Sequence, residues 1–346
     1  MTDLHKVKVN KELIKKLQKP LMLFILGLFL TIKEPGVFLT AANFKSILQA
    51  ISIYGVIVCG SIFTILLGGI DLSVGATAAI SGATCVVTII HFGFTTFSVV
   101  LGLVFGIGSG VLVGIINGSI VSFFSVPPFL ITLATQFIFY GVAQLITKNK
   151  VIGIMEPKAF TFIGGGRLFG IPFAIFILIF MAMLSYYILN FTAFGKKIYA
   201  VGGNKKAAAY SGIKTKRINI TAYAISGFTA AIAGIMLASW NQQAIAKAAY
   251  GYENDVLTAI VVGGTSLLGG EGSIQGAMFG AMLVGMINNG LRLLGVPSTY
   301  HSMVKGIIIV IAVAFDAHSR LKDSGYHKSF SIKNMVPFKK KKEVTA

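Results

Sequence analysis

Asp71 is the carboxylate with the most unusual surroundings in this sequence. It follows a Gly-Gly pair within the uncharged stretch TILLGGIDLSVGATAAISGA, residues 64–83. At the start of the next helix a carboxylate can accept hydrogen bonds from free backbone N–H groups and is favoured by the helix dipole. An ionisable side chain among apolar residues can instead face a pathway or a moving interface. The sequence leaves both roles open for Asp71.

The other residues that could perform chemistry form no catalytic or metal-binding pattern. The five histidines are scattered, and the chain has neither an HExxH nor a GxSxG motif. Cys59 and Cys85 lie in apolar runs without CxxC spacing, so they predict neither a disulfide framework nor a metal site. The sequence also lacks a GxxxxGKS/T phosphate loop, so any ATP must bind to another chain. We expect no catalytic residue, no metal and no cofactor in this chain.

The composition predicts an all-α integral membrane protein. Hydrophobic residues make up 55% of the 346 residues, charged residues 12%, and the mean hydropathy is +0.82. Soluble domains carry about 25% charged residues. The net charge of +19 does not indicate nucleic-acid binding, because the basic residues occupy the tails and one loop, where they flank apolar segments as membrane orientation requires.

About ten transmembrane helices are expected, since a spanning helix needs ~20 mostly apolar residues. The candidate spans cover residues 19–32, 47–67, 72–91, 97–124, 128–147, 171–190, 219–240, 255–268, 273–294 and 300–316. The eighth is short for a full crossing, so a discontinuous helix is expected there.

An even number of crossings places both ends of the chain on one side of the membrane. The basic segments are an N-terminal segment, 1–18, a loop, 191–218, and a C-terminal tail, 317–346, which flank or interrupt the membrane domain, 19–316. The loop carries seven lysines and arginines without an acid, so the positive-inside rule predicts that the loop and both termini are cytoplasmic. The N-terminal segment has no cleavage site of a secretory signal.

Small residues recur every four positions in two of the spans. They are Gly102, Gly106, Gly110, Gly114 and Gly118 in one, and Ala222, Ser226, Ala230, Gly234 and Ala238 in the other. This spacing lets helix backbones approach closely, so both spans are expected inside the bundle. Lining of a permeation path is the alternative role.

Two Gly-Gly motifs within the chain have similar sequences. GGIDLSVG at 68–75 aligns with GGTSLLGG at 263–270 at four of eight positions, and each follows one apolar run and precedes another. Each is therefore expected to be a tight break between two helices, with Asp71 or Ser266 capping the next helix. A possible internal repeat follows from this pairing.

Three long motifs resemble one known family. GGIDLSVGA, FGKKIYAVGGNKKAAAYSGIKTKRI at 194–218, and GYENDVLTAIVVGGTSLLGGEGSIQGAMFGAMLVGMINNGLRLLGV at 251–296 look like the membrane permeases of sugar-importing ABC transporters of the ribose, galactose and xylose type, in the branched-chain-permease-like superfamily. The similarity runs from about residue 40 to 316. It implies a bacterial-type cell membrane, a second permease copy, ATP-binding subunits that hold ATP and Mg, and an extracytoplasmic sugar-binding protein.

The resemblance also implies a coupling helix in the basic loop. Permeases of the wider importer class carry a cytoplasmic Glu-Ala-Ala followed by glycine, which docks on the ATPase. The matching coupling loop residues here are Gly202, Gly203, Asn204, Lys206, Ala207, Ala208, Ser211 and Gly212. Lys206 stands where glutamate is common, so a docking salt bridge of the usual sign is not expected. A basic loop that only fixes topology is the alternative.

Two further groups of residues are candidates for transport. The pathway or gating candidates are Asp71, Asn117, Asn288, Asn289 and Lys305, each of which could instead bond a neighbouring helix. The candidates for docking the binding protein are Lys148, Lys150, Lys158, Arg167, Glu253 and Asp255, for which simple solvated loops are the alternative.

The function predicted from the sequence is the permease subunit of an ABC importer for a monosaccharide, and not an enzyme. Permeases for nucleosides, signalling sugars or branched-chain amino acids are the nearest alternatives. An ion-coupled secondary transporter would want several intramembrane carboxylates, and the spans offer little beyond Asp71. The sequence names neither the sugar nor the choice between a homodimer and a heterodimer of permeases.

Overall fold

The protein is described by a computed structural model that covers residues 11–323; residues 1–10 and 324–346, the outer parts of the predicted basic N-terminal segment and tail, lie outside the described residues. Helices dominate the described range. They are α1 (Lys11–Lys33), α2 (Ala41–Leu66), α3 (Val74–His91), α4 (Thr96–Phe124), α5 (Pro128–Ile146), α6 (Lys158–Gly165), α7 (Phe173–Phe191), α8 (Ala193–Gly203), α9 (Lys205–Tyr210), α10 (Thr215–Asn241), α11 (Tyr252–Val262), α12 (Ile274–Leu293) and α13 (Ser298–Asp323). Four two-residue strands form two antiparallel pairs, β1 (Ile152–Gly153) with β4 (Gln243–Ala244) and β2 (Arg167–Leu168) with β3 (Ile171–Pro172).

Each of the ten expected spans overlaps a helix. Six described helices are long and apolar enough to cross a membrane by themselves: α2, α3, α4, α5, α7 and α10. The apolar parts of α1 and α13 are shorter, Pro20–Lys33 and Thr299–Ile311. The chain is thus an all-α integral membrane protein, as predicted.

The short eighth span is confirmed as an interrupted crossing, with different bounds. α11 has 11 residues, so it extends about 16 Å, roughly half of a ~30 Å hydrocarbon core. It begins at Tyr252, three residues earlier than expected, and ends at Val262. Residues 263–273, expected to include the end of this span, form turns instead.

The centre of the bundle consists of α10 packed against α2, α3 and α4. The small-residue stripes lie in these contacts. The span of α10 is interior as expected, whereas α4 turns only its glycine face inward and lies at the edge of the bundle, with Phe97, Val104 and Leu112 exposed on its other side. A Cβ atom added to Gly227 of α10 would collide with the carbonyl oxygen of Gly110 on α4, and one added to Gly234 would collide with that of Ala78 on α3. Glycine is required there because the backbones themselves are in contact.

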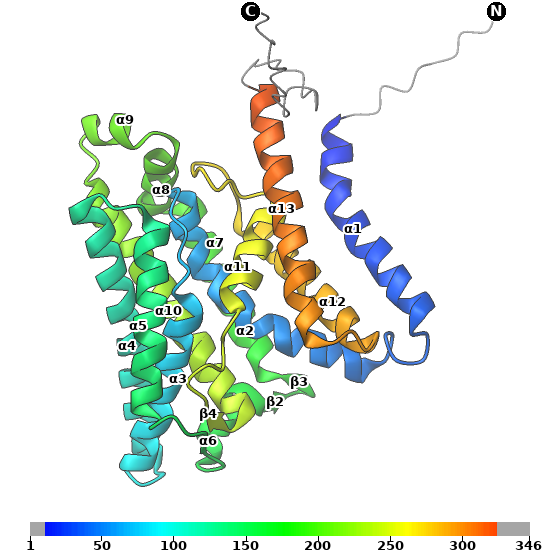
Figure 1. Cartoon of the computed structure of the whole chain (residues 1–346), viewed down its shortest axis with the longest axis vertical. Helices are drawn as coiled ribbons and strands as arrows, with labels where there is room; N and C mark the ends of the chain where they lie inside the picture. Colours follow the sequence, from blue (N-terminus) through cyan, green and yellow to red (C-terminus); the bar gives the residue numbers. More distant parts are fainter. Residues whose placement is uncertain (1–10, 324–346) are drawn as a thin grey trace, which may run out of the picture.

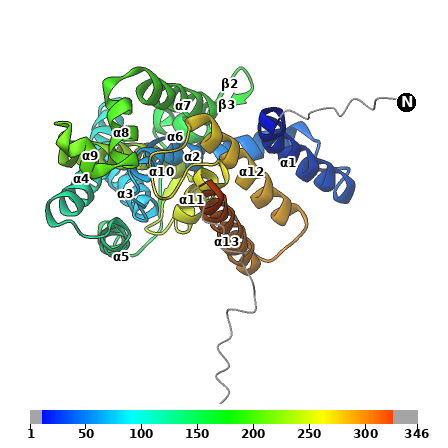
Figure 2. The ribbon, with the colours of Figure 1, turned by 90° about the horizontal axis from the view of Figure 1, so that it is seen from above.

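Different secondary-structure elements lie at the two ends of the helix bundle (Figure 1). The start of α1, the end of α13 and the pair α8–α9 lie at one end, and α6 with the strands β2, β3 and β4 lies at the other. Figure 2 shows α1 at the edge of the bundle, on the far side from α4 and α5. α1 packs against α12. The described ends of the chain therefore share a side with the predicted coupling loop.

Candidate functional site

The predicted coupling segment folds into two short helices, α8 and α9, that stand at one end of the molecule. Asn204 ends α8 and caps α9, because its side-chain Oδ1 accepts a hydrogen bond from the N–H of Ala207 at 3.0 Å. α9 ends at Ser211, and Gly212 follows with φ of +82°, a conformation that favours glycine. The short helix and its glycine stop were both expected from the sequence.

One face of α9 is exposed. Lys205, Lys206 and Ala207 are exposed, and Tyr210 is 91% exposed. Ala208 is buried against the core, so of the two alanines expected to form a contact surface only Ala207 faces outward. Tyr210 was not singled out from the sequence, although an aromatic residue beside a turn glycine is a signal that could have identified it.

Three glycine-rich segments meet where α8 reaches the bundle. We call this contact the glycine junction: residues 66–69 at the end of α2, residues 202–203 at the end of α8, and residues 268–270 in the turn after α11. The N–H of Gly270 donates a hydrogen bond to the carbonyl oxygen of Leu66 at 2.8 Å. A Cβ on Gly202 would collide with that same carbonyl oxygen and lie 2.6 Å from the Gly270 nitrogen.

The junction brings the two aligned Gly-Gly motifs together through glycines that the alignment does not pair. A Cβ on Gly269 would lie 2.7 Å from the nitrogen of Gly68, and one on Gly68 would lie 3.0 Å from the carbonyl oxygen of Leu268. The motifs are thus in direct backbone contact, each at the end of a helix. Gly68, Gly269 and Gly270 all have positive φ, which residues with a side chain rarely adopt.

Tyr199 adds a side-chain contact between α8 and the turn after α11. Its hydroxyl donates a hydrogen bond to the carbonyl oxygen of Gly272 at 3.0 Å. Partial burial raises the pKa of the Tyr199 phenol, so the hydroxyl remains a donor at neutral pH. α8 is therefore fixed to both motifs, and α9 extends from it.

Asp71 lies at the centre of a buried polar cluster between α3, α4 and α10. Its Oδ1 accepts hydrogen bonds from the N–H and hydroxyl of Ser73 at 3.0 and 2.6 Å, and its Oδ2 accepts one from Ser226 at 2.8 Å. The Asn117 amide donates to the Ser73 hydroxyl at 2.8 Å. The carboxylate thus holds the turn that begins α3 and joins it to two other helices.

Asp71 binds a backbone N–H at the start of α3, the type of contact expected of a helix cap, whereas Ser266 does not cap a helix. Asp71 binds the N–H of Ser73, which immediately precedes α3, although the N-cap position itself is Ser73. The hydroxyl of Ser266 accepts from the N–H of Leu268 within a turn, and no helix begins there. Ser273 caps the next helix, α12, by accepting from the N–H of Gly276.

Lys305 forms an ion pair with Asp255. The Nζ atom lies 2.8 Å from Oδ1 and 3.0 Å from Oδ2, and the Asn288 amide reaches Oδ1 at 3.4 Å. This arrangement joins α11, α12 and α13. The ion pair and the hydrogen bond give Lys305 and Asn288 the alternative role stated for both, a bond to a neighbouring helix.

Asn289 pairs with Asn43 across 246 residues of sequence. The Asn289 amide donates to Oδ1 of Asn43 at 2.8 Å, and the Asn43 amide donates to Oδ1 of Asn289 at 3.3 Å. Both side chains are buried, between α12 and α2. The structure therefore gives Asn289 the helix-bonding role that the sequence left open.

The predicted docking residues separate into two groups. Lys148, Lys150, Lys158 and Arg167 are exposed at the end of the molecule opposite α8–α9. Glu253 and Asp255 are buried, the first with its Oε1 accepting from the Gln136 amide at 2.9 Å. Their burial argues against the predicted docking role, because neither carboxylate is presented to a partner. The reason is that α11 begins inside the bundle rather than at its surface.

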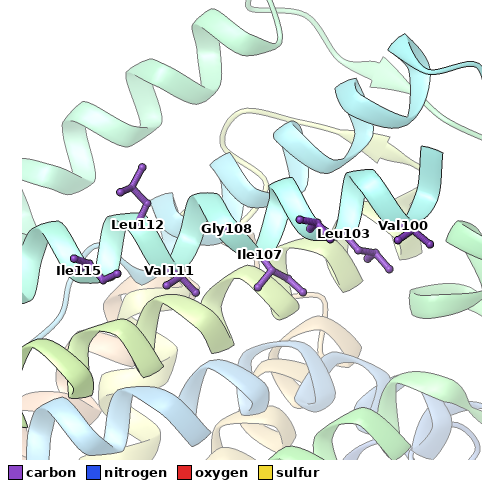
Figure 3. A pocket seen from close by; sticks show the side chains of 8 residues that line it. Val100, Leu103, Ile107, Gly108, Val111, Leu112 and Ile115 are labelled. Atoms are coloured by element: carbon purple, nitrogen blue, oxygen red, sulfur yellow. The ribbon is translucent and has the colours of Figure 1, made fainter. Parts of the chain in front are cut away.

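Two hollows on the surface differ in chemistry. A cavity of about 280 Å³ beside the glycine junction is lined by Gly68, Gly69, the α4–α5 turn, Lys205, Asn219 and Tyr223, so it has polar walls. A groove of about 570 Å³ runs along the outer side of α4 and is lined only by apolar residues of that helix, from Val100 to Ile115 (Figure 3). This groove offers no hydrogen bond to a sugar.

Comparison with known proteins identifies the family. Residues 43–313 match the family described as branched-chain amino acid transport system / permease component. The chain belongs to this family. Members are permease components, so the chain is not an enzyme.

Several curated relatives cover most of the chain. It is 39% identical over 303 residues to the ribose import permease protein RbsC of Bacillus subtilis, covering 87% of this chain and 92% of the relative. It is 34% identical to the L-arabinose ABC transporter permease protein AraH of Azospirillum brasilense, covering 82% of each chain. It is 33% identical to the fructose import permease protein FrcC of Rhizobium meliloti, covering 89% of each. No solved structure matches the chain significantly.

Proposed function

We propose that this chain is the membrane-spanning subunit of an ABC importer that carries a monosaccharide into a bacterial cell. The observation that carries the proposal is the identity to permeases named for ribose, L-arabinose and fructose, over more than four fifths of the chain. The family as a whole is described by branched-chain amino acid transport, which makes an amino acid the second candidate substrate. The sugar-named relatives favour the first.

We assign the exposed face of α9 to the contact with the ATP-binding subunit, which binds ATP and Mg. The side chains of Lys206, Ala207 and Tyr210 are exposed on α9. The seven basic residues of the segment 191–218 favour a cytoplasmic position, where the ATPase resides. Both termini are then cytoplasmic as well, because the described ends lie on the same side as α8–α9.

The opposite end of the molecule then faces the extracytoplasmic binding protein. Lys148, Lys150 and Lys158 are exposed there and can meet acidic groups on a docking protein, since complementary charges steer association. Arg167 differs from them because it lines a cavity.

A second permease copy completes the transporter in this proposal. The candidates Asp71, Asn117, Asn288 and Lys305 are assigned to gating contacts between helices rather than to the lining of the pathway, since each bonds a neighbouring helix. A homodimer is expected if this chain and the ATPase alone support transport. A need for a related permease would show a heterodimer.

The glycine junction supplies the mechanical connection. A displacement of α8–α9 by the ATPase acts on Leu66 and Gly270 through backbone contacts that no side-chain rotation can absorb. The end of α2 and the turn after α11 therefore respond together. ATP shifts the inward–outward equilibrium only to the extent that the ATPase binds the two states with different affinity.

The test is ATP hydrolysis in proteoliposomes that contain this chain, its genomically adjacent ATPase and the adjacent binding protein. The binding protein is loaded in turn with ribose, L-arabinose, fructose, galactose, xylose or leucine. Stimulation by one loaded sugar supports the proposal and names the substrate. Stimulation by leucine alone would favour amino-acid import, and uptake driven by an ion gradient without the ATPase would reject an ABC mechanism.

A further inference from the structure

A cavity of about 380 Å³ opens at the end of the molecule opposite α8–α9, and no role considered above uses it. Its walls come from four elements: the first turns of α2, the end of α6, the β2–β3 pair and the end of α10. The lining residues are Ala42, Lys45, Ser46, Gln49, Gly164, Gly165, Arg167, Pro172 and Trp240.

The walls of this cavity are held in place by buried hydrogen bonds. The Gln49 amide donates to the carbonyl oxygen of Gly164 at 2.6 Å, which joins α2 to α6. The N–H of Gly164 donates to the hydroxyl of Ser239 at 2.7 Å, and that hydroxyl donates to the carbonyl oxygen of Phe160 at 2.6 Å. The cavity is thus a formed site rather than a gap between loosely packed elements.

The charge of the cavity is positive and uncompensated. Lys45 and Arg167 both line it, and none of the lining residues is acidic. Within residues 11–323 neither cation has an ion pair or a side-chain hydrogen bond to a described residue. Two cations on one small cavity repel each other, so an anion between them would lower the free energy of the site. The planar guanidinium of Arg167 suits a phosphate group in particular.

The surroundings place this cavity at the boundary of the membrane. It lies where the spanning helices α2 and α10 begin and end, which is the level of lipid headgroups. Large apolar side chains are exposed around it: Trp240 on its wall, Phe162 on α6 and Phe169, which is 89% exposed in the β2–β3 turn. Aromatic residues gather at this level because one part of the ring contacts lipid and another contacts water.

We propose that the cavity binds the phosphate of an anionic phospholipid, held between Lys45 and Arg167, with the acyl chains against the exposed apolar side chains. An arginine guanidinium binds phosphate through paired hydrogen bonds, and a lysine ammonium binds it as a point charge. Exposed Phe169 and Phe162 favour a lipid over a free soluble anion, because acyl chains would cover them and a bare anion would not. The assignment does not depend on which solute is transported.

The experiment measures lipid retention by native mass spectrometry of the purified full-length permease. The protein is incubated with equal amounts of phosphatidylglycerol and phosphatidylcholine of identical acyl chains. We expect selective retention of phosphatidylglycerol, and at least a fivefold loss of that selectivity in the double variant Lys45→Gln/Arg167→Gln. The matched control is Lys150→Gln/Lys158→Gln, which removes the same charge from exposed positions at the same end, outside the cavity lining, and should change selectivity less than twofold.

Other outcomes would overturn the proposal. Equal loss in the control variant would mean attraction to general surface charge, and no selectivity in the wild type would mean no lipid site. Displacement of phosphatidylglycerol by millimolar inorganic phosphate would indicate a site for a soluble anion. If the cavity variant keeps its lipid but loses stimulation by the binding protein, the surface is a protein docking site. The single variants Lys45→Gln and Arg167→Gln test the site if the double variant does not fold.

Discussion

The backbone atoms around Gly202 in the coupling segment leave no room for a side chain. We expect Gly202→Ala to destabilise the protein by ~1–3 kcal/mol, the usual cost of overpacking, and to reduce transport. The new methyl group would collide with the carbonyl oxygen of Leu66, a backbone atom that cannot rotate away. Thermal unfolding and uptake in proteoliposomes measure the two effects.

The adjacent residue provides a matched control. Gly203 has no atom within 4 Å of an added Cβ and is exposed, so Gly203→Ala should leave both stability and uptake near wild type. If the two variants behave alike, the glycine junction does not constrain α8 as described.

The Asp255–Lys305 pair allows a second prediction about single residues. Lys305→Met leaves the buried Asp255 carboxylate uncompensated, so we expect a loss of about 3 kcal/mol in unfolding free energy, the lower end for a buried pair because Lys305 is 21% exposed. The double variant Asp255→Asn/Lys305→Met should recover most of this loss, since the charge is removed with its partner. Melting temperatures in detergent would measure both, and a double variant no more stable than the single would rule out this explanation.

Sequence reasoning at the residue scale found most of these side chains but not their partners. Asp71, Asn288, Asn289 and Lys305 stand out because polar groups are rare in apolar spans. Their partners lie on other helices, up to 246 residues away in the sequence. The pattern of residues in one sequence does not show which of these distant positions come into contact. This is why Glu253 and Asp255 were expected at the surface: nothing in their spacing shows that α11 begins inside the bundle.

Among the helices, α9 presents the exposed face that is proposed to contact the ATPase. We expect Ala207→Arg to abolish co-purification of the ATPase while the permease stays folded in the membrane, because a long charged side chain at the centre of a contact surface prevents close approach. Ala193→Arg is the control: it adds the same charge to an exposed alanine of α8, outside α9. Normal co-purification of Ala207→Arg would mean that the ATPase binds elsewhere.

The helices themselves were largely predictable, and the interruptions were predictable in part. Long apolar runs fix α2, α4 and α10 because each must satisfy its backbone hydrogen bonds within lipid. The Gly-Gly motifs marked where α2 and α11 end. What the sequence did not show is that the motifs touch each other and α8, since backbone contact leaves no trace in residue type beyond the glycines.

For the whole molecule, cysteine labelling can test which end faces the cytoplasm. The two native cysteines should give no background signal. Cys59 and Cys85 are both fully buried, so a membrane-impermeant maleimide should not label the wild type. Tyr210→Cys places a thiol on exposed α9, and Lys158→Cys places one on exposed α6. We expect Tyr210→Cys to react in inside-out vesicles and Lys158→Cys to react in right-side-out vesicles, because α9 and α6 lie at opposite ends of the bundle.

Each labelling pattern has a definite meaning for transport. Labelling of both variants from one side would contradict the opposite placement of α6 and α9. Labelling with the sides exchanged would keep the fold but invert its orientation, and α9 could then not reach an ATPase that needs cytoplasmic ATP. Only the expected pattern allows the basic segment 191–218 to meet the ATPase while Lys148, Lys150 and Lys158 meet a binding protein outside the cell, so this measurement tests the orientation on which both proposed contacts depend.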